Sequence, residues 1–73
     1  MLLSFTNIRD KLNLIYLNTD NIISARELDN KHLYDQTLKE FKGIVVEIQM
    51  SNGVCYCVNG PLRDVVASVN IAN

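Results

Sequence analysis

The sequence lacks any strong excess of charge of one sign. Its 73 residues include seven Lys or Arg and eight Asp or Glu, which gives a formal net charge of −1. A protein that holds nucleic acid or an anionic membrane by electrostatics has a basic stretch or face, and the scattered charges here predict none. Nucleic acid is therefore an unfavoured partner for this chain.

Long apolar runs are also missing. No stretch approaches the roughly 18 apolar residues that a membrane-spanning helix needs. Residues 1–3 are apolar, but the run is too short for a signal peptide and no basic segment precedes it. We therefore expect a cytoplasmic protein with no membrane segment.

Residue types that carry chemistry are scarce. His32 is the only histidine, and no serine or cysteine nucleophile is placed beside it by local sequence. The three glycines stand apart at Gly43, Gly53 and Gly60, so no Gly-rich loop is available to cradle a phosphate. This composition predicts no enzyme activity and no cofactor.

The two cysteines, Cys55 and Cys57, lie two positions apart. A disulfide between such neighbours on a strand would be strained, and the pair could supply two thiolate metal ligands only with help from elsewhere. The single histidine is far away in sequence. We therefore interpret both cysteines as reduced, inward-facing core residues, and we expect no metal site.

The clearest positive signal is a β-hairpin over residues 43–58. Asn52-Gly53 lies between two runs of strand-forming residues, and both residue types tolerate the positive φ that a type I′ turn needs. If they form the whole loop, Met50 faces Cys55. Because side chains alternate, one face is then apolar and holds Ile44, Val46, Ile48, Met50, Cys55 and Cys57. The other, mixed face holds Val45, Glu47, Gln49, Val54, Tyr56 and Val58.

Three further strands are predicted before the hairpin, over residues 2–6, 12–17 and 22–26. In the first, Leu3 and Phe5 face inward. In the second, Ile15 and Leu17 share one face, while Leu14 and Tyr16 share the other. The third segment is either a strand or a turn that leads into one, and in it Ile23 and Ala25 continue the period of two. Polar residues at 7–11 and 18–21 predict the turns between them.

Residues 27–42 are ambiguous. Tyr34, Leu38 and Phe41 recur at i, i+4 and i+7, which is typical of one helical stripe, and Asn30 could cap such a helix. The alternative is a long connection without regular structure, which is uncommon inside a compact domain. We expect a short helix or a single helical turn within this segment.

A helix is predicted after Pro61. Leu62, Val65, Val66 and Val69 form an apolar stripe, and three β-branched residues mean that the helix must be stabilised by packing on the sheet. The whole chain, residues 1–73, is then a single α+β domain. It combines an antiparallel sheet of about five strands, open or barrel-like, with a C-terminal helix.

The pattern resembles a known family. Its quoted parts are residues 14–24, which include Tyr16-Leu17-Asn18-Thr19-Asp20, then residues 46–53 and 62–66. They are similar to the FlbD-type family of short bacterial and phage open reading frames, which have a strand, a Tyr-Ile-Asn-Pro-Asp turn, a strand, a hairpin and a terminal helix. The departures are Thr19 in place of proline and the insertion at 27–42. The resemblance implies a small accessory protein without catalytic motifs.

Two surfaces are candidates for binding a protein. The mixed hairpin face offers Val45, Val54, Tyr56 and Val58, which either contact a partner or a second copy, or are covered by the helix. The insertion offers Tyr34, Leu38 and Phe41 as anchors, with Lys31, Asp35 and Lys39 as a polar rim, unless these apolar residues cap the core.

We therefore predict a non-enzymatic regulatory protein that binds a larger protein as an adaptor or inhibitor. The abundance of Asn and Ile suggests a phage or mobile-element gene. The alternatives are a nucleic-acid-binding regulator, a structural homo-oligomer such as a dimer, and a flagellar accessory protein.

Overall fold

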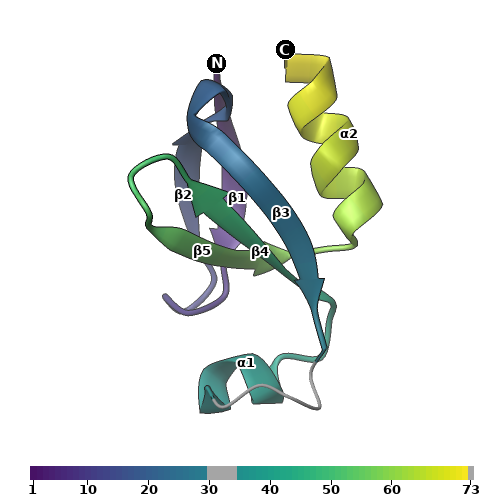
Figure 1. Cartoon of the computed structure of the whole chain (residues 1–73). Helices are drawn as coiled ribbons and strands as arrows, with labels where there is room; N and C mark the ends of the chain where they lie inside the picture. Colours follow the sequence, from purple (N-terminus) through teal and green to yellow (C-terminus); the bar gives the residue numbers. More distant parts are fainter. Residues whose placement is uncertain (30–34, 73) are drawn as a thin grey trace.

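The structure, a computed structural model, describes residues 1–29 and 35–72 (Figure 1). Its strands are β1 (Leu2–Asn7), β2 (Asn13–Asn18), β3 (Ile22–Leu28), β4 (Val45–Met50) and β5 (Cys55–Asn59), and its helices are the 3-10 turn η1 (Thr19–Asn21), α1 (Gln36–Glu40) and α2 (Leu62–Ala72). The strands form one antiparallel sheet in the order β2-β1-β5-β4-β3. The α+β class is confirmed, and the sheet stays open, with β2 and β3 at its edges.

The hairpin of β4 and β5 has a three-residue loop. The N–H of Gly53 donates to the Met50 carbonyl and the N–H of Met50 donates to the Val54 carbonyl, both at 2.9 Å. Gly53 takes a φ of 87°, and the Asn52 side chain accepts a hydrogen bond from the N–H of Val54 at 3.0 Å. This is a turn closed by a left-handed glycine, a common three-residue hairpin connection.

The predicted register is therefore wrong by one residue. Gln49, not Met50, pairs with Cys55, and Ile48 pairs with Tyr56. A shift of one residue in one strand turns its side chains to the opposite face relative to its partner. Val58 therefore joins Val46 on one face, whereas Cys57 joins Val45 on the other.

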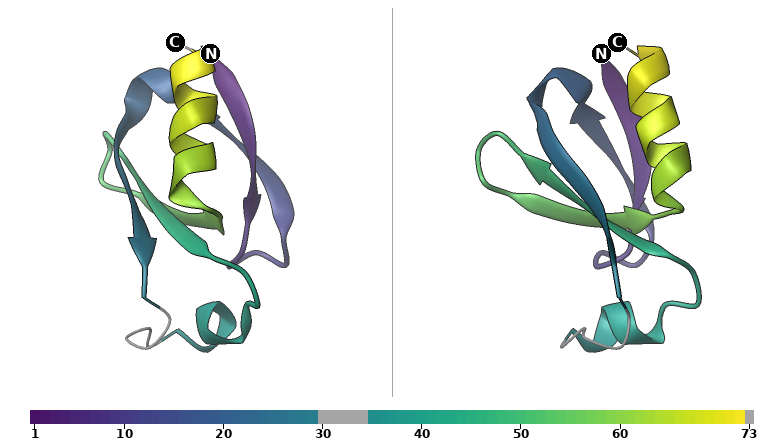
Figure 2. Two further views of the ribbon diagram at one scale, coloured as in Figure 1. Left: turned by 90° about the vertical axis from the view of Figure 1, so that its right-hand side faces the viewer. Right: turned by 45° about the vertical axis from the view of Figure 1, so that its right-hand side comes forward.

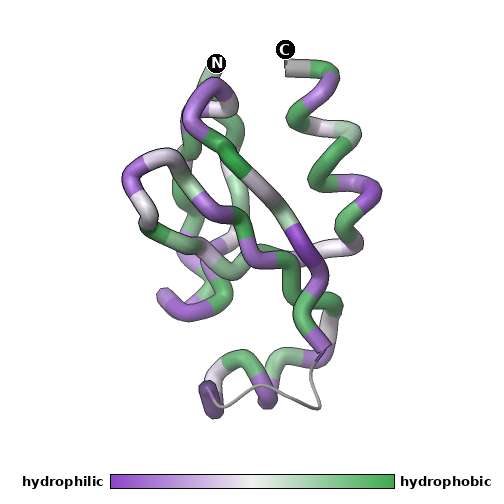
Figure 3. The backbone as a smooth tube through the Cα atoms, in the orientation of Figure 1, coloured by the Kyte–Doolittle hydropathy of each residue, from purple (hydrophilic) through white to green (hydrophobic). Residues whose placement is uncertain are grey.

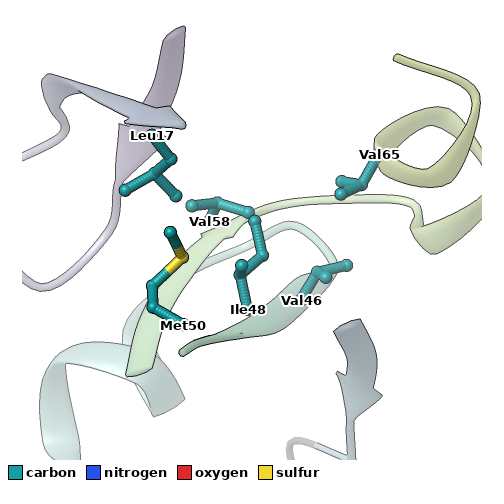
Figure 4. Close-up of a cluster of buried hydrophobic side chains, with 6 residues drawn as sticks. All are labelled: Leu17, Val46, Ile48, Met50, Val58 and Val65. Atoms are coloured by element: carbon teal, nitrogen blue, oxygen red, sulfur yellow. The ribbon is translucent and has the colours of Figure 1, made fainter. Parts of the chain in front are cut away.

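The inner face of the sheet carries the main hydrophobic core. Its buried members are Leu17, Val46, Ile48, Met50, Val58 and Val65 (Figure 4). Helix α2 lies across this face, between β3 on one side and β1 on the other (Figure 2). The helix thus covers the concave side of a sheet that does not close on itself.

Helix α2 is anchored at its first turn. The Pro61 carbonyl accepts hydrogen bonds from Asp64 and Val65, and the carboxylate of Glu27 accepts one from the N–H of Leu62 at 3.1 Å. An acceptor at this position satisfies a backbone donor that has no partner inside the helix. Because Glu27 belongs to β3, this cap also ties the helix to the edge of the sheet.

A second cluster lies on the opposite, outer face. Short helix α1 places Leu38 against Ile8, Val45 and Cys57, and Phe41 packs beside them. Asp35 caps α1 by accepting hydrogen bonds from Thr37 and Leu38. The predicted short helix is confirmed, whereas the proposed cap Asn30 lies outside the described residues.

The N-terminal strands are confirmed, with one exception in β3. Its pairing with β4 is irregular between Ile22 and Ser24, a bulge that changes the alternation of side chains. Ile22 and Ala25 therefore pack on the core, and Ile23 is 63% exposed. The prediction that Ile23 shares a face with Ala25 was wrong because the period of two is interrupted there.

The packing of α2 predicts that aspartate substitutions at two neighbouring valines differ in their cost to stability. Val65 is 5% exposed and Val66 is 43% exposed. An unpaired carboxylate in the core is costly, so Val65→Asp should lower the free energy of unfolding by about 3 kcal/mol or more, whereas Val66→Asp should cost about 1 kcal/mol or less. Urea denaturation of both variants measures the difference. Equal losses would show that α2 is not docked through Val65.

Candidate protein-interaction surface

The outer face of the sheet is uncovered at β1 and β2. Leu2, Leu14 and Tyr16 are 63%, 64% and 65% exposed. Ser4 pairs with Tyr16 and Thr6 pairs with Leu14, so these side chains share one side of the two strands. Strands β1 and β2 also form a hairpin, distinct from that of β4 and β5. We call the set Leu2, Ser4, Thr6, Leu14 and Tyr16 on β1 and β2 the hairpin outer face.

Strand β2 is an edge strand without the usual protection. Asn13–Asn18 contains no charged residue and no proline, and its six pairs with β1 follow one unbroken register. Exposed edges are normally blunted by charges, prolines or bulges, because a free row of backbone groups invites another strand. On these criteria β2 is open to pairing.

The other edge, β3, is protected. It contains the bulge near Ile22, and it carries Arg26 and Glu27. Arg26 forms an ion pair with Glu47 at 3.0 Å, and Figure 3 shows β3 changing from hydrophobic at its start to hydrophilic near its end. The two edges of the same sheet therefore differ in their readiness to accept a strand.

The hydrogen-bond directions show which groups of β2 face outward. The N–H of Thr19 donates to Met1, and the N–H of Ile8 donates to Cys57 on β5. Backbone groups alternate in direction along an antiparallel strand. The N–H and C=O groups of Leu14 and Tyr16 therefore point away from β1, toward the open edge.

The predicted mixed face of the hairpin is not formed. Val45 and Val58 are fully buried on opposite faces of the sheet, and Tyr56 is half-buried beside the main core. Val54 is 43% exposed next to the turn. A surface built from these four residues does not exist, because the register puts Val45 on the opposite face from the other three and Val58 is buried in the main core.

The predicted anchors of the insertion are divided between core and surface. Leu38 is 1% exposed and Phe41 is half-buried, so both belong to the outer cluster. Asp35 caps α1 and pairs with Arg9 at 3.3 Å, and Lys39 is exposed. Lys31 and Tyr34, like His32, lie outside the described residues.

The two cysteines differ in environment. Cys55 is exposed and Cys57 is buried, and both are free thiols. Burial raises the pKa of the Cys57 thiol, and the nearby charge of Arg9 opposes this only in part. The prediction that both cysteines face inward was therefore wrong for Cys55.

The groove between β3 and α2 is lined mainly by residues without catalytic or metal-binding side chains. The groove between β3 and α2 has a volume of about 170 Å³ and is lined mainly by apolar side chains such as Ile22, Val66 and Val69. Within residues 1–29 and 35–72, no group of three His, Cys, Asp or Glu is arranged to hold a metal ion. In the same residues, no helix is both long and apolar enough to cross a bilayer.

No protein-family model, curated protein or solved structure matches this chain. The resemblance to the FlbD-type family therefore stays a prediction. Two features of the molecule bear on function: the exposed apolar side chains of the hairpin outer face and the unpaired edge of β2. Sequence reasoning placed Leu14 and Tyr16 on one face but did not single them out. The uncharged run from Asn13 to Asn18 was the available signal.

The cysteines provide a test of the corrected register. Cys55 should react with a thiol reagent in the native protein, whereas Cys57 should react only after denaturation, because it is buried and its raised pKa leaves less thiolate. Mass spectrometry of the labelled protein counts and locates the modified thiols. Fast native labelling of both, or of Cys57 alone, would contradict this register.

Proposed function

We propose that this protein is a small non-enzymatic regulator that binds a larger protein, as an adaptor or an inhibitor, through the hairpin outer face. The observation that carries the proposal is the exposure of Leu14 and Tyr16 on an uncharged edge strand. Contiguous exposed apolar side chains are typical of interaction sites.

The residue types suit a protein partner. Tyrosine is among the residues enriched at binding hot spots, and the polar neighbours Ser4 and Thr6 supply hydroxyl groups beside it. The face carries no charged side chain, which disfavours a phosphate backbone as its ligand. The net charge of −1 points the same way.

The proposed location is the cytoplasm. Two free thiols fit a reducing compartment. The resemblance to the FlbD-type family is compatible with an accessory role of this kind.

The proposal predicts that a charge on the hairpin outer face weakens partner binding. Leu14→Lys places an ammonium group in the proposed contact and should weaken affinity by about tenfold or more, since each tenfold corresponds to about 1.4 kcal/mol. The matched control is Ile23→Lys, because Ile23 is 63% exposed and Leu14 is 64% exposed. The wild-type chain and both variants are used as bait in the native host, and affinity for the captured protein is then measured.

Melting temperatures confirm that both variants fold. The expected result is capture by the wild-type chain and by Ile23→Lys, with loss for Leu14→Lys. Equal capture by all three would overturn the assignment of the hairpin outer face.

A further inference from the structure

We infer that the free edge of β2 pairs with β2 of a second copy, so that two sheets join into one and two hairpin outer faces become a single surface. The inference rests on the proposed function for the role of that joined surface. The partner strand at the open edge is therefore β2 of a second copy of this chain.

Area is the first argument. The largest apolar patch on an ordinary monomer covers about 300–600 Å². A standard protein interface buries about 800 Å² on each side. A face in this size range is smaller than a standard interface, and joining two of them gives about 600–1,200 Å², a range that includes the standard size.

The second argument is that β2 is complementary to itself. An antiparallel two-fold pairing has an axis perpendicular to the sheet, so outward side chains stay outward and each residue is opposite one of the same parity. Centred on Ile15, this pairing sets Leu14 opposite Tyr16 of the second copy. Aromatic and aliphatic cross-strand neighbours of this kind stabilise a sheet.

The backbone fits the same arrangement. The N–H and C=O groups of Leu14 and Tyr16, which point away from β1, would form hydrogen bonds with the same groups of the second copy. The two Ile15 residues would lie opposite each other between these pairs and exchange no backbone hydrogen bond. No like charges meet along the strand, because Asn13–Asn18 contains no charged residue. The edge is thus compatible with a second copy in hydrogen bonding, in side-chain contact and in charge.

A charge exchange tests the pairing. One variant combines Leu14→Lys with Tyr16→Lys, and another combines Leu14→Glu with Tyr16→Glu. Both sites are exposed, so the fold should tolerate them. Sedimentation equilibrium on the wild-type chain at high micromolar concentration should give twice the mass of the 73-residue chain. Each variant alone should associate at least about tenfold more weakly, because like charges face each other.

An equal mixture of the lysine and glutamate variants should recover association to within about threefold of the wild type, because opposite charges then meet across the axis. Ile23→Lys, on the protected edge, should leave the dimer unchanged. A wild-type chain that remains monomeric at these concentrations would overturn the inference. So would variants that dimerise alone as strongly as the wild type, or a mixture that stays monomeric.

Ser4→Lys separates this inference from the proposed function. Ser4 lies on the hairpin outer face but on β1, away from the free edge. This variant should keep the dimer and lose partner capture. A monomeric wild type whose capture is lost in Leu14→Lys would remove the pairing and keep the binding face. A dimer whose capture is unaffected by Ser4→Lys would keep the pairing and remove the binding face.

Discussion

The register of β4 against β5 is the constraint on which the rest of the structure depends. Pairing of Gln49 with Cys55 sends Val46, Ile48 and Val58 to the inner face, where α2 covers them. The same pairing sends Val45 and Cys57 to the outer face, where Leu38 covers them. The left-handed Gly53 permits this register, because it can close a loop of three residues rather than two.

Both faces of the sheet carry apolar residues, and each is covered by a different helical element. Helix α2 spans the inner face, whereas α1 reaches only one end of the outer face. A chain of this size buries only about 60% of the surface of its unfolded form, so two small clusters share the stabilisation that a larger domain obtains from one core. On the outer face, Leu2, Leu14 and Tyr16 of β1 and β2 stay exposed, whereas β3 and β4 carry polar pairs such as Arg26 with Glu47.

The two sheet edges differ in what their side chains do. On β3, Glu27 caps α2 and Arg26 pairs with Glu47, so this edge is occupied in holding the fold together. Strand β2 contains no charged residue, so none of its side chains can form an ion pair that holds this edge. The difference explains why a binding role is assigned to β2 although both strands lie at an edge.

The sequence by itself determined the α+β class, the Asn-Gly hairpin, the apolar stripe of α2 and the alternation in β2, because each depends on local periodicity or turn chemistry. Only the tertiary structure decided the loop length, the bulge at Ile22 and the burial of Ile8 in a polar turn. These depend on pairing and packing between distant segments. The candidate site was hidden for the same reason. Exposure of Leu14 and Tyr16 follows from which end of the outer face α1 covers, and local sequence does not encode that.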